Sequence, residues 1–176
     1  GPSAGGVAGV LGRWVRNAAP LPAARPPLPP AAARQVADWE RFLNGDSLKQ
    51  QVTARYLYEH WFVAHLHFDD QPAGPFFRLV RSRTPPGEAG DEIATVRPYD
   101  DPGVARVWYR LVPIDGTIVH KTHIVYPLGA ARMRRLQALF LDADWQPSRM
   151  PSYAPADASN PFATYVEMPA AARYQY

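Results

Sequence analysis

A long apolar segment with a defined start places the strongest constraint on how this chain can fold. Ser47 and Gln50 have the spacing of a capping box, which predicts a helix beginning at Leu48. Apolar and aromatic residues continue through "RYLYEHWFVAHLHFDD" and predict that this helix runs to about His67 and is buried. The segment also carries a glutamate and three histidines, which are either hydrogen-bonded core groups or parts of a site.

The rest of the pattern predicts an α+β domain over residues 34–176. A helix is expected over 31–44, ending at an Asn-Gly C-cap, and an amphipathic helix over 129–142. Strand character appears at 76–83, 92–98, 105–113 and 117–128, and a turn at 114–116 predicts that the last two form a hairpin. We therefore expect two N-terminal helices, a small antiparallel meander of three to four strands, a C-terminal helix and an irregular Pro/Tyr-rich tail.

Residues 1–33 differ in composition from this domain. The stretch "AAPLPAARPPLPPAAA" is rich in proline and alanine, which is typical of an extended linker. The chain starts without methionine and without the basic start and apolar core of a signal peptide, which indicates a piece of a longer protein.

Composition excludes several kinds of function. The 19 basic residues are nearly balanced by 16 acidic ones, so a general nucleic-acid binder is not expected. The absence of cysteine removes disulfides, zinc fingers, iron–sulfur clusters and covalent c-type haem attachment from this stretch of chain. The motifs of phosphate-binding loops, dinucleotide-binding folds and nucleophile elbows are absent as well.

The histidines are the first candidates for chemistry. On the predicted helix, His60 and His67 share a stripe and His65 lies opposite, with Glu59 facing Arg55. Seven residues of helix separate His60 and His67 by about 10 Å, too far to share one metal ion. The alternative is a set of histidines hydrogen-bonded inside a buried helix. A further candidate, His123, lies in a strand whose polar centre indicates a pocket or interface, or simply a central strand.

Three arginines of the 76–83 strand are the second candidates. Alternation puts Arg81 and Arg83 on one face of the strand and Arg78 on the other. Their planar guanidinium groups suit a carboxylate or a phosphate. The alternative is an ordinary solvated face.

Several longer phrases resemble successive blocks of the bacterial fatty acid cis/trans isomerases. They cover nearly the whole chain from about Leu11, in order and with similar spacing. The blocks are "WERFLN", "ARYLYEHWFVAHLHF", "FFRLVRSRTPPG", "DEIATVRPYDDPGVARVWYRL", "TIVHKTHIVYPL", "MPSYAPADASNPFATY" and the closing "RYQY".

The resemblance implies a periplasmic enzyme, several times longer than this chain, that converts cis-unsaturated acyl chains of membrane lipids to trans under membrane stress. It also implies haem c, attached upstream by a C-x-x-C-H motif, whose iron withdraws electron density from the double bond. The present chain resembles the middle of that enzyme, and residues 1–33 resemble a linker and the tail of the haem-bearing part. Its implied partners are membrane phospholipid or free unsaturated fatty acid and the haem-bearing remainder of the parent chain.

The resemblance transfers no residue role to this segment, so the candidates are those of the sequence pattern. His60, His67 and His123 could supply an axial haem ligand or a polar contact, and Arg78, Arg81 and Arg83 could hold a lipid head group or carboxylate. The alternatives to part of an isomerase are a non-catalytic lipid- or haem-binding module and a structural support domain.

One expectation follows directly from the missing cysteines. We expect the isolated 176-residue chain to carry no covalent haem and to form no trans product from cis-vaccenate. Haem that survives acid–acetone extraction, or trans product detected by gas chromatography, would contradict this expectation.

Overall fold

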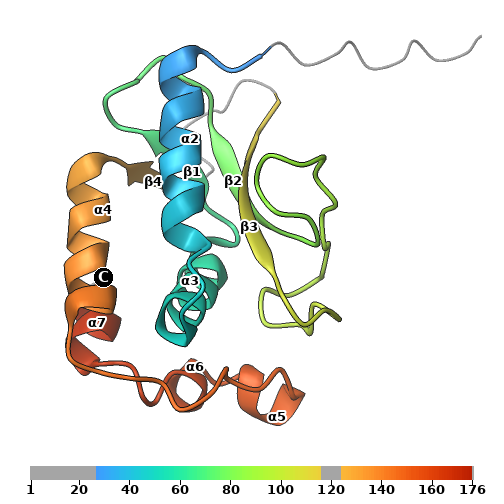
Figure 1. Cartoon of the computed structure of the whole chain (residues 1–176), viewed down its shortest axis with the longest axis vertical. Coiled ribbons are helices and arrows are strands. Elements are labelled where there is room, and N and C mark those ends of the chain that lie inside the picture. Colours follow the sequence, from blue (N-terminus) through green and yellow to red (C-terminus); the bar gives the residue numbers. More distant parts are fainter. Residues whose placement is uncertain (1–26, 116–123, 176) are drawn as a thin grey trace, which may run out of the picture.

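The computed structural model of the chain describes residues 27–115 and 124–175. Helices α2 and α3 lie on one face of a four-stranded sheet, α4 runs beside α2, and the C-terminal tail passes below them (Figure 1). The contacts are α2 with β3, α3 with β2 and α4 with β4. This arrangement confirms the α+β class.

The two N-terminal helices begin and end at recognisable caps. Helix α2 spans Pro30–Leu43. It starts with proline, which lacks an N–H, at a position whose N–H would have no hydrogen-bond partner within the helix. It thus begins inside the stretch expected to be a linker. Helix α3 spans Leu48–Trp61, and both hydrogen bonds of the predicted capping box between Ser47 and Gln50 are present.

The second half of the apolar segment is a strand, so the prediction of a helix to His67 was wrong. Helix α3 ends at Trp61, and β1 spans His65–Phe68. Leu66 and Phe68 are buried while the histidines beside them are half-buried. This alternation has the period of a strand, and the apolar character of the segment concealed it.

The sheet is mixed, with strand order β3-β2-β1-β4. Strands β2 (Phe77–Ser82) and β3 (Trp108–Pro113) are antiparallel over their whole length, whereas β1 and β4 (Val125–Leu128) are parallel. The predicted hairpin of 105–113 with 117–128 was therefore wrong, because β3 and β4 lie at opposite edges. Segment 92–98 forms no strand and contributes a single bridge from Glu92 to Ser82. Residues 117–123 of the predicted fourth strand lie outside the described residues.

The edge of β3 is closed by side chains of α2, which explains why β4 does not pair there. The Asn44 side chain donates to the Tyr109 carbonyl and accepts from the Tyr109 N–H, both at 2.8 Å. The Glu40 carboxylate accepts from the Leu111 N–H at 2.9 Å. These bonds replace those of a further strand.

The predicted helix over 129–142 is present in two parts. Helix α4 spans Ala130–Leu136 and continues as a π-helix, η1, over Gln137–Asp142. Leu136 and Phe140 are fully buried, as the amphipathic pattern predicts. The Phe140 carbonyl accepts a hydrogen bond of 2.8 Å from the indole N–H of Trp145.

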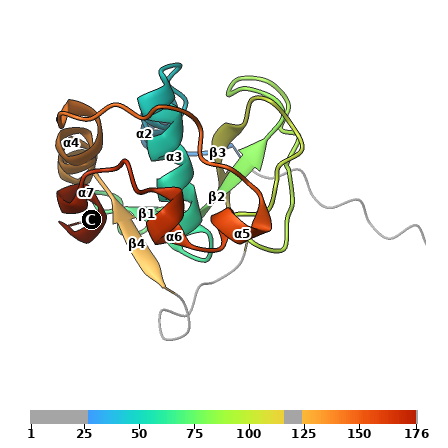
Figure 2. The same cartoon turned by 90° about the horizontal axis from the view of Figure 1, so that it is seen from below.

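The C-terminal tail contains three short helices, α5 (Pro155–Ala158), α6 (Pro161–Thr164) and α7 (Ala170–Gln175). Seen from below in Figure 2, it crosses α3 to reach α5 and returns through α6 to α7. Arg55 of α3 attaches the start of this tail. Its guanidinium donates to the carbonyls of Pro151 and Ser152 and stacks over the Tyr153 ring at 3.7 Å.

Arg55 is also paired with Glu59 at 2.9 Å, and their side chains are 1% and 9% exposed. We predict that Arg55→Met lowers the free energy of unfolding by about 3–5 kcal/mol, because it leaves a buried carboxylate without its cation. Urea denaturation measures the loss. The matched control is Arg41→Met, whose pair with Asp38 is 75% and 57% exposed and is expected to cost less than about 1 kcal/mol. Equal effects of the two substitutions would contradict this role of Arg55.

Burial raises the pKa of Glu40 above its ordinary value near 4.5, although the Leu111 hydrogen bond and the charge of Arg110 oppose the shift. A raised pKa in the folded state gives stability that is complete below pH 4.5 and is lost as the pH rises through the folded pKa. We predict that Glu40→Gln, which retains the acceptor for Leu111, removes this loss.

Urea denaturation between pH 4 and pH 8 checks the prediction. Glu40→Gln should gain stability relative to the natural protein as the pH rises, whereas Glu88→Gln, at an exposed position, should show no such trend. Glu40→Ala should cost about 1–3 kcal/mol, because it leaves a buried N–H unsatisfied. A pH-independent difference between Glu40→Gln and the natural protein would exclude this role for the Glu40 proton.

Candidate functional site

The two predicted histidines that the structure describes, His60 and His67, lie on different elements. His60 lies exposed at the end of α3, where its Nδ1 donates to the Tyr56 carbonyl at 2.7 Å and its ring packs on the Tyr56 ring at 4.0 Å. His67 is on β1 with its ring 5.6 Å from that of Phe76. Because the two histidines lie on different elements, the helical separation expected between them does not apply. His123 lies outside the described residues.

Two observations bear on a haem or metal site. Among residues 27–115 and 124–175, no three histidine, aspartate or glutamate side chains are arranged to hold a metal ion. The chain has no cysteine, so it offers no thioether bond to a haem. His60 has one feature of an axial ligand, because a backbone carbonyl fixes its ring through Nδ1. Among the described residues, His60 is therefore the one with the geometry of a candidate haem ligand.

The three predicted arginines have different surroundings. Arg78 forms two hydrogen bonds with the Glu92 carboxylate, at 2.5 and 2.7 Å, and this pairing lowers the pKa of Glu92. Arg83 pairs with Asp91 at 3.0 Å, and both side chains are about half exposed. Arg81 is 1% exposed and pairs with no carboxylate within 4.0 Å among the described residues.

Arg78 and Arg81 border the same cavity, whereas Arg83 does not. The cavity holds about 240 Å³ and lies between the end of α3, strand β2 and residues 92–95. Its wall includes the rings of Tyr58 and Phe62, the Glu92 carboxylate and Thr95. The structure thus brings two of the three predicted arginines together at one cavity.

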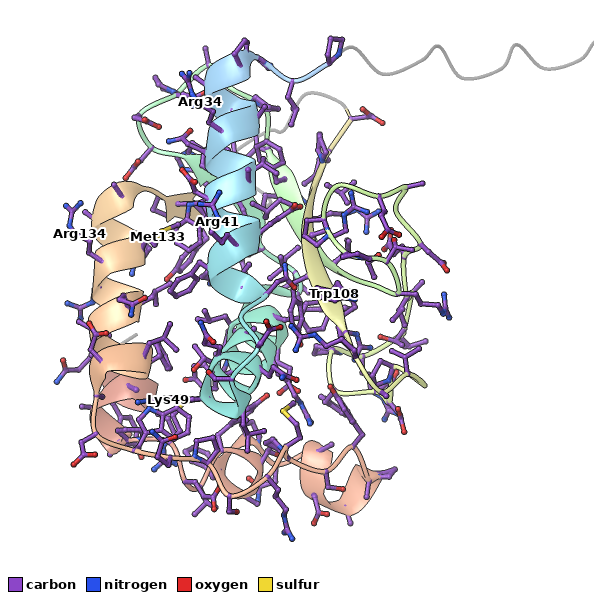
Figure 3. The ribbon with its side chains drawn as sticks, viewed as in Figure 1. Arg34, Arg41, Lys49, Trp108, Met133 and Arg134 are labelled. Atoms are coloured by element: carbon purple, nitrogen blue, oxygen red, sulfur yellow. The ribbon has the colours of Figure 1, made fainter. Side chains whose placement is uncertain are left out.

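A larger groove lies between α2 and α4. It holds about 440 Å³, within the range of about 300–1,000 Å³ usual for small-molecule sites. The apolar part of its wall comes from Trp39, Phe42, Met133 and Leu141, and its polar part includes three glutamines, Gln35, Gln50 and Gln137. In Figure 3 the Met133 side chain of α4 lies between the two helices, near Arg41 of α2.

Exposed cations lie on the two helices that form this groove. Arg34 of α2 and Arg134 of α4 are exposed and form no ion pair with any described residue. Arg41, on the rim, is paired with Asp38 at 2.8 Å. Lys49, below the groove in Figure 3, donates to the Ala143 carbonyl and faces the Trp145 ring. Neither Arg34 nor Arg134 is part of the groove wall, and in Figure 3 Arg134 lies on the side of α4 away from α2.

Sequence reasoning missed this groove. Its two walls are about 90 residues apart in the sequence, and no local pattern indicates that α2 and α4 run side by side. The available signals were the helical spacing that puts Trp39 and Phe42 on one side of their helix and the amphipathic pattern that puts Met133 on the inward side of the 129–142 helix. A half-buried Met133 and a half-buried Phe42 mark where that inward side opens to solvent.

No helix within residues 27–115 and 124–175 has the length and apolar character needed to cross a membrane. No curated protein and no solved structure matches the chain. The family model described as fatty acid cis/trans isomerase matches residues 8–176, which is nearly the whole chain. That match agrees with the resemblance of the sequence blocks, and the chain therefore belongs to the fatty acid cis/trans isomerase family.

Proposed function

We propose that the parent protein isomerises cis-unsaturated acyl chains of membrane lipids to the trans form under membrane stress, and that this chain holds the acyl chain. The family supports the reaction. The observation that supports the role of this chain is the groove between α2 and α4, the largest of the cavities described above.

The wall of the groove suits a hydrocarbon chain. Each buried methylene contributes about 0.8 kcal/mol, so a few buried carbons on each side of a double bond give useful affinity. Met133 is unbranched and flexible, and it can adjust to a bent cis chain and to a straighter trans chain. Isomerisation needs a site that accepts both shapes, and a deformable wall meets that need.

Exposed cations on the two helices that form the groove suit a lipid head group. Arg34 and Arg134 are not engaged by carboxylates of the described residues, so their charge can act on a phosphate. On this proposal they replace Arg78 and Arg83, which are occupied by Glu92 and Asp91.

We place the haem c in the remainder of the parent chain and the whole protein in the periplasm. When bound, the haem would supply an iron that withdraws electron density from the double bond. This chain's contribution is to bind the acyl chain, keep water from it and fix its position. His60, exposed at the end of α3 with its ring oriented by Tyr56, is the described histidine best suited to face that haem.

Filling the groove tests the proposal. We predict that Met133→Trp weakens binding of cis-9-hexadecenoate by at least about tenfold, because the indole occupies volume that methylenes would fill. Isothermal titration calorimetry below the micelle concentration of the acid measures this. In the parent protein with its haem region, the same substitution should lower the trans product by a similar factor.

Met133→Leu is the matched control, because it conserves volume and should leave binding within about threefold of the natural protein. Unchanged binding in Met133→Trp would place the acyl chain elsewhere. Unchanged binding together with lost isomerisation would assign the groove a role other than holding the substrate.

A further inference from the structure

Helix α4 presents a cationic face, which consists of Arg132, Arg134 and Arg135. At about 100° per residue, these side chains lie on the arc of the helix away from Met133 and Leu136, which face the groove and the core. Arg134 and Arg135 are exposed and Arg132 is half-buried. The helix itself contains no acidic residue, so its outward surface carries charge of one sign.

The charge of this face is not neutralised within the part of the chain that the structure describes. None of its three arginines forms an ion pair with a described residue. Arg135 donates to the Gln175 carbonyl at 2.6 Å, and the Arg132 guanidinium lies 4.7 Å from the centre of the Tyr126 ring. Both partners are neutral, so these contacts position the arginines and leave their charge in place.

Arginines elsewhere in the described chain are treated differently. Each of six has a carboxylate within 4.0 Å, namely Arg41, Arg55, Arg78, Arg83, Arg97 and Arg106. The cationic face therefore differs from most of the arginine-bearing surface, where each positive charge lies beside a negative one.

An ordinary solvated helix does not need such a face. Oppositely charged residues three or four apart stabilise a surface helix, whereas Arg132 and Arg135 are neighbours of like charge that repel each other. An extended anionic surface relieves this repulsion, because it can meet all three guanidinium groups at once. A basic amphipathic helix is typical of a segment that lies on a membrane surface, and guanidinium groups suit the phosphates of lipid head groups.

The end of α7 adds an aromatic side chain near this face. The hydrogen bond from Arg135 to Gln175 attaches α7 to α4, and the adjacent Tyr174 is 73% exposed. Tyrosine is enriched at the boundary between membrane and water, where its ring meets apolar groups and its hydroxyl stays hydrated.

We infer that the cationic face of α4 docks this chain on an anionic bilayer, with its arginines on lipid phosphates and Tyr174 at the membrane boundary. Because α4 also forms one wall of the groove, docking brings the groove close to the lipids. The inference rests on the part of the proposed function in which the parent protein acts on membrane lipids. It does not rest on the groove as the site of the acyl chain.

Co-sedimentation of the whole chain with lipid vesicles tests the docking. The chain should bind vesicles that contain phosphatidylglycerol at least about tenfold more tightly than vesicles of phosphatidylcholine alone, because each arginine near an anionic surface contributes about fivefold. Raising the salt concentration should weaken this binding, because salt screens exposed charges. Arg132→Gln/Arg135→Gln should weaken it by at least about tenfold.

Two variants serve as matched controls for this double substitution. Arg132→Lys/Arg135→Lys keeps the charge and should bind within about threefold of the natural protein, since the attraction depends on charge. Arg83→Gln/Arg97→Gln removes the same amount of charge from the segment that joins β2 to β3, which lies across the sheet from α4 (Figure 1). It should leave binding within about threefold as well.

A second measurement covers the case in which the glutamine variant fails to fold. Because the chain has no cysteine, Ala131→Cys gives one labelling site for an environment-sensitive fluorophore on the exposed side of α4. Phosphatidylglycerol vesicles should raise its emission, whereas the same label on Ala89→Cys, an exposed position between β2 and β3, should not respond.

Three outcomes would each overturn the inference: equal binding to the two kinds of vesicle, undiminished binding in a folded glutamine variant, or unchanged emission from the label at position 131. The first would leave an acidic protein as the candidate partner of this face. Met133→Trp should leave vesicle binding unchanged while it weakens binding of cis-9-hexadecenoate. Failure of the docking is therefore distinguishable from failure of the acyl groove.

Discussion

The closure of the β3 edge by α2 determines how the other elements are arranged. Asn44 and Glu40 satisfy backbone groups of Tyr109 and Leu111 that would otherwise pair with another strand. With that edge occupied, β4 pairs with β1 at the far side of the sheet. The chain leaving β4 then enters α4 beside α2, and the groove between these helices follows from that placement (Figure 1).

Local signals in the sequence predicted the elements better than their arrangement. The capping box at Ser47 and the Asn44 cap are short-range hydrogen-bond patterns, and both are present. The edge closure could not be predicted, because it joins residues 65 and 71 positions apart through side chains that serve equally well as surface groups. The prediction of a helix after Trp61 was wrong for another reason, because a buried helix and a buried strand have the same apolar composition.

In the candidate site, too, the sequence identified residues but not how they are arranged. The sequence singled out Arg81, but nothing in an alternating strand distinguishes a buried arginine from an exposed one such as Arg83. What separates them is the covering segment 92–100, which contributes Thr95 and Asp100 to Arg81. Similarly, the amphipathic pattern of residues 129–142 does not show that Met133 lies beside α2, because that placement depends on the mixed sheet. The role of a residue here is set by contacts distant in sequence.

The lower wall of the groove is formed by residues of the π-helix at Gln137–Asp142, so it depends on the number of residues in that helix. A π-helix holds about one more residue per turn than an α-helix, and such turns occur mostly singly inside α-helices. Loss of one residue here would rotate everything after it by about 100°. Leu141 would turn away from α2, and Phe140 would leave the core contact that orients Trp145. Length changes within this helix are therefore a direct route by which related chains could acquire grooves of different shape on an unchanged sheet.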